Sequence, residues 1–247
     1  MAEHQDGASG LLEVAVLHAR DVPGCVEGGA DRLSLAVEGR SPDVPTASSV
    51  IRACDLPVRV VLRLDDTFTT NGGDLMRLIG LAREYVALGA EGVTFGFLDA
   101  DLGIDVETTR ALAESLPGVP WTFHRAVDAT LEPRRAWAHL DGLPGLDAVA
   151  TGGSPQGLAH GYDDVLALLD DVPGVARVLM ACGGLRPDHV PWLVQAGVRQ
   201  FQVDEQVRPG GSEKAYVDAA LVRSWRLLLD DVVAQRGPRA AGATDAR

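Results

Sequence analysis

Short apolar segments recur along the chain and alternate with longer segments of helical periodicity. Most of the apolar segments are nearly continuous, which is typical of parallel strands that are covered on both faces. The pattern therefore predicts an α/β fold built around a parallel sheet. The predicted strands are 11–16, 32–37, 58–64, 92–98, 121–127, 146–151, 176–182 and 199–205.

The segments between these strands carry apolar residues at helical spacing. The clearest follows Gly73, where the stripe of Leu75, Leu78, Ile79, Ala82 and Val86 predicts a helix that Gly89 ends. Asp105 is a predicted N-cap, and Pro133 and Pro187 suit a first helical turn. Other helices are predicted over 108–116, 133–140, 163–169, 187–196 and 216–229, whereas 38–54 accommodates only a short one.

Eight strands in strict alternation with about eight helices predict a single (β/α)₈ TIM barrel over residues 11–235. The segments 1–10 and 236–247 are small, polar and aperiodic, and we expect disordered tails there. The competing fold is an open doubly wound sheet. Its G-x-G-x-x-G fingerprint is missing after the first strand, which favours the barrel.

Composition narrows the possible partners and the cellular compartment. The net charge of −13 argues against nucleic-acid binding and against docking on anionic membranes. No apolar run is long enough to span a bilayer, and the N-terminus lacks the features of a signal peptide. Three scattered cysteines do not form a disulfide framework. We therefore expect a cytoplasmic protein.

The reactive end of a barrel is the end where the strands finish. The pairs Gly152-Gly153 and Gly183-Gly184 each follow a predicted strand there. Glycine lets backbone N–H groups approach an anion at a helix N-terminus, so both pairs are candidate anion-binding loops. The alternative is a tight turn that needs positive φ.

Ionisable side chains gather at the same end in the sequence WTFHRAVD (121–128). His124 with Asp128 or Glu13 can act as a general acid or base, and Arg63 and Arg125 can hold an anion. Each residue alone also has a structural interpretation, since Arg125 can pair with Glu13 or Asp128. Burial of so many ionisable groups is costly without partners, so the cluster favours a functional pocket.

Lysine and sulfur chemistry give weaker signals. Lys214 is the only lysine and lies in a polar loop, which argues against a Schiff-base enzyme. Met180 and Cys182 lie two apart on one strand face and form a soft pair suited to Cu(I), although such residues are more often core. Cys25 and Cys54 are expected to serve helix packing.

Several motifs together resemble the copper homeostasis protein CutC family. They are LLEVAV, CVEGGADRLSL, LAREYVALGAEGVTFGFL, WTFHRAVD, TGG, MACGGL and AGVRQFQ, in that order. The resemblance implies a (β/α)₈ barrel, cytoplasmic copper handling and a homodimer or higher homo-oligomer. The shared polar positions are Glu13, Arg32, Arg63, His124, Arg125, Asp128, Gly152-Gly153 and Gly183-Gly184.

The chain departs from the family pattern at several polar positions. Ser34 stands for a glutamate, Ala36 for a cysteine, and Cys182 for a glycine. Asp65 follows Arg63 where the family has an Arg-Pro-Arg sequence, and Asp204 replaces part of a His-Gly-Ser motif. The sulfur has therefore moved from the second strand to the seventh, and the mouth has gained carboxylates.

Three functions are compatible with these residues. The first is copper binding or trafficking, with Cu(I) on Met180 and Cys182. The second is a barrel enzyme of the lyase, isomerase or hydrolase class that acts on a small anionic or phosphorylated metabolite. The third is a scaffold whose pocket has degenerated.

Overall fold

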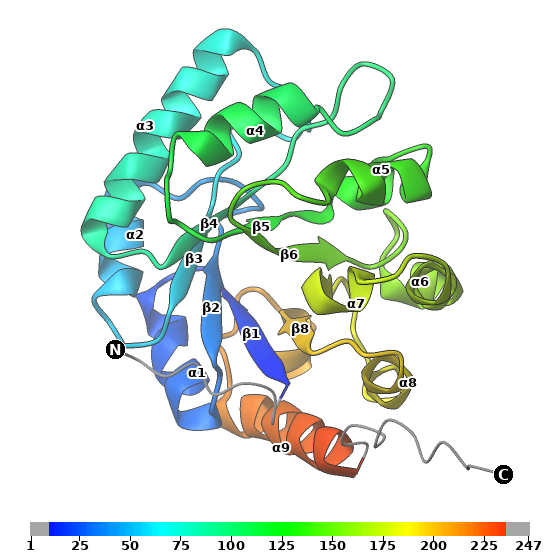
Figure 1. The fold of residues 1–247 in the computed structure, drawn as a ribbon. Coiled ribbons are helices and arrows are strands. Elements are labelled where there is room, and N and C mark those ends of the chain that lie inside the picture. The colour runs from blue at the N-terminus through cyan, green and yellow to red at the C-terminus, as the bar shows by residue number, and fades with distance from the viewer. Residues whose placement is uncertain (1–9, 236–247) are drawn as a thin grey trace, which may run out of the picture.

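A computed structural model describes residues 10–235 and has one closed sheet of eight parallel strands. The barrel runs in sequence order from β1 to β8, and helices surround it (Figure 1). The predicted (β/α)₈ TIM barrel is thus confirmed. The strands are β1 (Leu11–Val16), β2 (Arg32–Leu35), β3 (Val58–Val61), β4 (Gly92–Phe95), β5 (Trp121–Phe123), β6 (Leu146–Thr151), β7 (Leu179–Ala181) and β8 (Gln200–Val203).

The helices follow the strands and bury their apolar faces against the sheet. They are α1 (Val22–Gly28), α2 (Val44–Ile51), α3 (Gly72–Leu88), α4 (Val106–Glu114), α5 (Pro133–Leu140), α6 (Leu158–Asp171), α7 (Val175–Val178), α8 (Val190–Gln195) and α9 (Ala219–Gln235). Short 3₁₀ turns η1 (Ala19–Asp21), η2 (Arg125–Ala129), η3 (Glu205–Val207) and η4 (Pro209–Gly211) join them. No helix among residues 10–235 has the length and apolarity that a membrane crossing requires.

Most predicted helix signals are confirmed by the local geometry. Asp105 caps α4 by accepting a hydrogen bond from the Thr108 backbone N–H at 3.0 Å. Gly89 ends α3 with a φ of 105°, a conformation that favours glycine. Pro133 lies in the first turn of α5. Pro187 was wrongly expected in a first turn, because α8 begins at Val190 and Pro191 occupies that place.

The strands are shorter than their apolar segments. The segments predicted over 58–64 and 92–98 end as strands at Val61 and Phe95, and their last apolar residues pack beneath loops. The segment 176–182 contains the short helix α7 before β7 starts at Leu179. The predicted tails lie outside the described residues except Gly10, which accepts a hydrogen bond from Arg226.

The strand register determines which inward-facing side chains lie at the same height along the barrel axis, and these side chains form layers. A barrel with a shear of about one residue per strand brings residues of alternate strands to one level. Below the mouth, the register places Ser34, Thr94, Ala150 and Gln202 at one such level, here named the floor layer. The layer above it holds Ala15, Val61, His124 and Cys182.

Two layers beneath the floor layer carry charged side chains and are named the charged layers. They contain Glu13, Arg59, Thr122 and Met180, and then Arg32, Gly92, Ala148 and Gln200. Arg59 pairs with Asp147 and Glu91, and it donates to Thr122 at 2.6 Å. The charged side chains in the lower part of the barrel interior are therefore paired with one another, and the mouth lies above them.

Candidate functional site at the barrel mouth

A cavity of about 560 Å³ opens at the carboxyl ends of the strands. Its charged and titratable lining includes Arg63, His124, Arg125, Asp204 and Glu213. The structure thus places three of the predicted site residues, Arg63, His124 and Arg125, around one cavity. Its size falls in the range of small-molecule pockets, about 300–1,000 Å³.

His124 presents a defined tautomer to this cavity. It directly follows β5, and its Nδ1 accepts a hydrogen bond from the Ala126 backbone N–H at 3.2 Å. Nε2 therefore carries the ring proton, and no acceptor for it exists among residues 10–235. Burial, together with the charge of Arg63, lowers the pKa of His124 to about 4. The imidazole is neutral near pH 7 and can donate a hydrogen bond to a ligand.

Arg63 supplies positive charge beside His124. Its guanidinium lies 4.7 Å from the centre of the Phe68 ring and donates to the backbone carbonyls of Asp66 and Thr67. No carboxylate of the described chain lies within ion-pair distance of it. Burial lowers the pKa of Arg63, which still leaves an arginine charged. The Asp65 and Asp66 carboxylates act on this charge from beyond ion-pair distance, so the half-buried guanidinium has no direct ion pair and can accept an anion.

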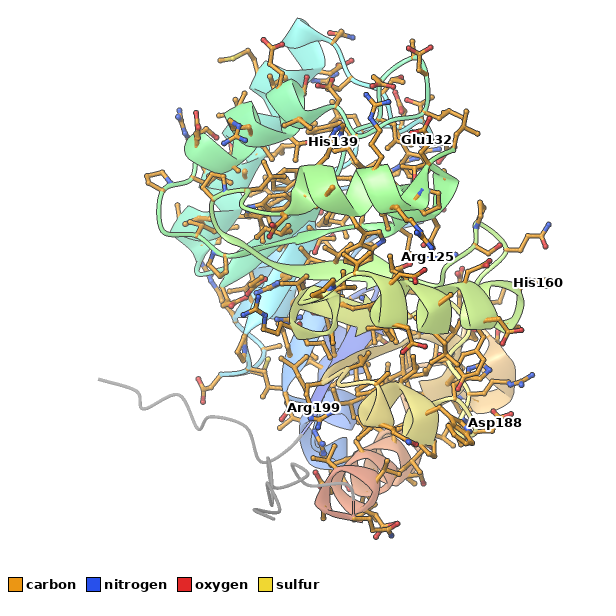
Figure 2. The ribbon with its side chains drawn as sticks, turned by 45° about the vertical axis from the view of Figure 1, so that its right-hand side comes forward. Arg125, Glu132, His139, His160, Asp188 and Arg199 are labelled. Atoms are coloured by element: carbon orange, nitrogen blue, oxygen red, sulfur yellow. The ribbon has the colours of Figure 1, made fainter. Side chains whose placement is uncertain are left out.

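Arg125 is held by Asp128, which lies beneath it. The Arg125 Nε donates to Asp128 Oδ2 at 2.9 Å, and Nη2 donates to the Ser154 carbonyl at 2.8 Å. Asp128 is buried and accepts two further bonds, from Thr151 Oγ1 and from the Gly152 N–H at 3.0 Å. Figure 2 labels Arg125 on the side where α5 and α6 face the viewer. Asp128 therefore positions Arg125 and does not line the mouth cavity.

The two glycine pairs differ in what they offer an anion. The N–H groups of Gly152 and Gly153 are already bound to Asp128 and to Thr151 Oγ1. A Cβ on Gly153 would lie 2.3 Å from the Gly161 carbonyl oxygen, so this pair serves the close packing of α6. The N–H groups of Gly183 and Gly184 have no acceptor within residues 10–235, and the Arg125 guanidinium packs on Gly183.

Glu13 is sealed beneath the floor layer. It is 1% exposed, its Oε2 pairs with Arg32, and its Oε1 accepts from Gln202 Nε2 at 2.6 Å. Since both oxygens have partners and neither faces the mouth cavity, Glu13 does not meet His124 as the sequence suggested. Its contact with Gln202 instead fixes the amide of a side chain that does line the cavity.

Several further residues line the cavity. Asp204 follows the eighth predicted strand and departs from the family pattern, but the sequence assigns it no role. Partial burial and the nearby Glu205 and Glu213 carboxylates raise its pKa to about 6. Thr94 and Gln202 read as ordinary strand residues. Their position in the cavity follows from the strand register, which is known only from the structure of the closed barrel.

The predicted soft-metal pair lies inside the barrel and is fully enclosed. Met180 and Cys182 are both 0% exposed and pack against Ala148 and Ala150. Burial raises the pKa of the Cys182 thiol, so the thiolate that binds a metal is disfavoured. The Met180 sulfur lies 3.6 Å from the cationic Arg32 Nη2. No group of three His, Cys, Asp or Glu in the described part of the chain could hold a metal ion. These residues do not fit resident Cu(I).

The remaining cysteines belong to helix packing. Cys25 is buried in α1, and burial raises the pKa of its thiol to about 12. Cys54 follows α2, is partly buried, and packs against the apolar core. The three cysteines are free thiols. The packing interpretation made for Cys25 and Cys54 from sequence agrees with these positions.

The fold and the cavity define a (β/α)₈ barrel with a polar cavity at the carboxyl ends of its strands. The CutC family profile matches residues 10–206, and the chain belongs to the CutC family. The family protein CutC of Klebsiella pneumoniae (strain 342) is 29% identical over 89% of this chain and 92% of its own. The human copper homeostasis protein cutC homolog is 30% identical over 77% of this chain and 71% of its own.

Solved structures show the same architecture. CutC from Streptococcus agalactiae superposes with a TM-score of 0.69 at 20% identity, covering 78% of this chain and 97% of its own. Thiamine phosphate pyrophosphorylase from Pyrococcus furiosus gives a TM-score of 0.58 at 17% identity, covering 91% and 97%. At these identities the likeness concerns the fold alone.

Proposed function

We propose that this CutC-family barrel binds a small anionic metabolite at its mouth, with Arg63 and Arg125 as the anion-holding groups. The observation that carries the proposal is the half-buried Arg63 guanidinium, which forms no direct ion pair, next to the neutral His124. Neither Gly183 nor Gly184 lines the cavity, but Gly183 packs against Arg125, and its N–H has no acceptor within residues 10–235. Together they supply what binding of a carboxylate or phosphate needs.

The same arrangement supports acid–base chemistry on the bound ligand. His124 carries its proton on Nε2, so it is set to protonate or to hydrogen-bond an oxygen of the ligand. An enzyme of the lyase, isomerase or hydrolase class uses such a group. In line with the family, we also propose a cytoplasmic location and a homodimer or higher homo-oligomer.

The experiment is a thermal unfolding series with inorganic phosphate and with small carboxylates. A ligand that binds the folded state raises the midpoint in proportion to ln(1 + [L]/Kd). We expect a concentration-dependent rise for the wild type and a loss of most of it in Arg63→Gln. Arg110→Gln removes an exposed arginine on α4, outside the cavity, and is the matched control. No response of the wild type to any of these anions would contradict the proposal.

Copper homeostasis is the role that the name of the human relative suggests. For this chain, direct Cu(I) binding draws support only from Met180 and Cys182, which share the barrel interior. Anaerobic Cu(I) titration against a strong chelator tests it. Because the enclosed pair does not fit the ion, we expect affinity no tighter than micromolar, unchanged in Cys182→Ser. Tight binding that Cys182→Ser abolishes would restore copper as the ligand.

A further inference from the structure

The floor layer leaves hydrogen-bonding groups without partners in the mouth cavity. Ser34, Thr94, Ala150 and Gln202 all line the cavity, and together they close its lower end. Thr94 is 6% exposed, and its Oγ1 is a buried atom with no hydrogen-bond partner. Ser34 is 6% exposed, and no partner for its Oγ is found among residues 10–235.

Gln202 adds an oriented acceptor to the two hydroxyl groups. Its Nε2 donates to the sealed Glu13, which fixes the side-chain amide with Oε1 as the remaining atom. No donor to this Oε1 exists in the described part of the chain. The floor layer therefore offers two hydroxyls, which both donate and accept, and one carbonyl oxygen.

Most other buried threonine hydroxyls have a partner; Thr109 Oγ1 also lacks one, but Thr109 does not line the cavity. Thr122 accepts from Arg59 at 2.6 Å, and Thr130 donates to the Val127 carbonyl at 2.8 Å. A polar group that is buried without a partner is costly, and such groups mark places where a ligand or water completes the hydrogen bonds. The residues of the floor layer that carry these groups line a cavity large enough for a ligand.

The charges around the cavity restrict what this ligand can be. Cations lie at Arg63 and Arg125, whereas Glu38, Asp204 and Glu213 line the mouth as well. An apolar body would leave the floor-layer groups unpaired, and a second anionic group would face the carboxylates. A ligand with one anionic end and a neutral, hydroxyl-bearing remainder satisfies both sets of groups.

We propose that the ligand is a polyhydroxylated monomeric anion of the sugar-acid or sugar-phosphate type. Its acidic group lies at Arg63 and His124, and its hydroxyls reach Thr94, Ser34 and Gln202 in the floor layer. This inference rests on the proposed anion site and specifies its substrate class. Sites that hydrogen-bond a substrate hydroxyl discriminate strongly against analogues without it, so the floor layer is the specificity determinant.

Calorimetric titration of the full chain tests this with four probes: inorganic phosphate, ribose 5-phosphate, gluconate and hexanoate. We expect a hydroxyl-bearing anion to bind at least tenfold more tightly than the anion without hydroxyls. Comparing the affinities of ribose 5-phosphate and inorganic phosphate tests whether hydroxyls strengthen the binding of a phosphate. Comparing gluconate with hexanoate tests the same for a carboxylate. Whichever pair shows the difference identifies the headgroup.

Thr94→Val removes the hydroxyl and keeps the shape of the side chain. We expect it to weaken the hydroxyl-bearing anion about tenfold and to leave inorganic phosphate unchanged. Thr109→Val is the matched control, because Thr109 is a buried α4 residue whose Oγ1 also lacks a partner, away from this cavity. It should leave both affinities unchanged.

Two results separate the failure of this inference from the failure of the anion site. If phosphate binds but ribose 5-phosphate and gluconate bind no more tightly than their simple counterparts, the hydroxyl specificity is overturned and the anion site stands. If Thr94→Val and the wild type bind the hydroxyl-bearing anion with equal affinity, the hydroxyl specificity is likewise overturned and the anion site stands. If none of the four probes binds, both proposals are overturned.

Discussion

The charged layers and the mouth of this barrel hold similar residue types in opposite states. Below the floor layer, Glu13, Arg32 and Arg59 all have ionic or hydrogen-bonded partners. At the mouth, Arg63 forms no direct ion pair, and the hydroxyl of Thr94 has no partner among residues 10–235. Arg125 at the mouth is paired too, with Asp128, so the difference lies in Arg63 and Thr94. Groups without a direct protein partner that belong to residues lining the cavity are the ones we take to indicate ligand binding.

The largest expected effect comes from breaking a pair in the charged layers. Arg32→Met leaves the buried Glu13 without its cationic partner. Removal of one member of a buried ion pair costs about 3–5 kcal/mol of the free energy of unfolding. Urea unfolding measures the loss. The double variant Glu13→Gln with Arg32→Met removes both charges, so it should recover most of the lost free energy of unfolding. A loss below about 1 kcal/mol in Arg32→Met alone would show that this ion pair does not stabilise the fold.

His124 at the mouth should affect stability less, and only in acid. Its pKa is lowered from 6.5 to about 4, so the folded protein favours the neutral ring. The stability that this contributes is present above about pH 6.5 and is lost as the pH falls toward 4, since the unfolded chain takes up the proton first. We expect His124→Asn to remove about 2 kcal/mol of this acid dependence. Unfolding at pH 4.5 and 7.5 measures it, and parallel profiles of the two proteins would contradict it.

Asp204 should give the smallest effect and the opposite pH dependence. Its folded pKa is raised from 3.8 to about 6, so the stability linked to its proton is present below about pH 4 and lost as the pH rises through 6. Asp204→Asn should therefore stabilise the protein at pH 8 by about 1 kcal/mol, allowing for its half-exposed side chain, and not at pH 4. Equal gains at both values would show that its charge is not involved.

The sequence predicted the barrel and the start of every strand except the seventh to within one residue, because these depend on local pattern. Strand ends were less accurate. Leu62 and Leu98 are as apolar and as buried as strand residues, but they lie beyond the strand ends at Val61 and Phe95. The short helix α7 was missed because Val175–Val178 merges with the apolar run of β7.

The site was predicted in part for a related reason. Arg63, His124 and Arg125 follow strand ends, and fold topology alone delivers them to one cavity. Whether a polar residue is paired depends on strands distant in sequence, as in the contacts of Glu13 with Arg32 and Gln202. Thr94 entered the site only through the register of the closed barrel.

We propose that Arg63 and His124 at the mouth form an anion site. A crystal structure of the wild type with inorganic phosphate is the decisive measurement. We expect a tetrahedral anion within hydrogen-bonding distance of the Arg63 guanidinium and of His124 Nε2, with Met180 and Cys182 still packed in the interior. A mouth that holds only water at saturating phosphate would contradict it.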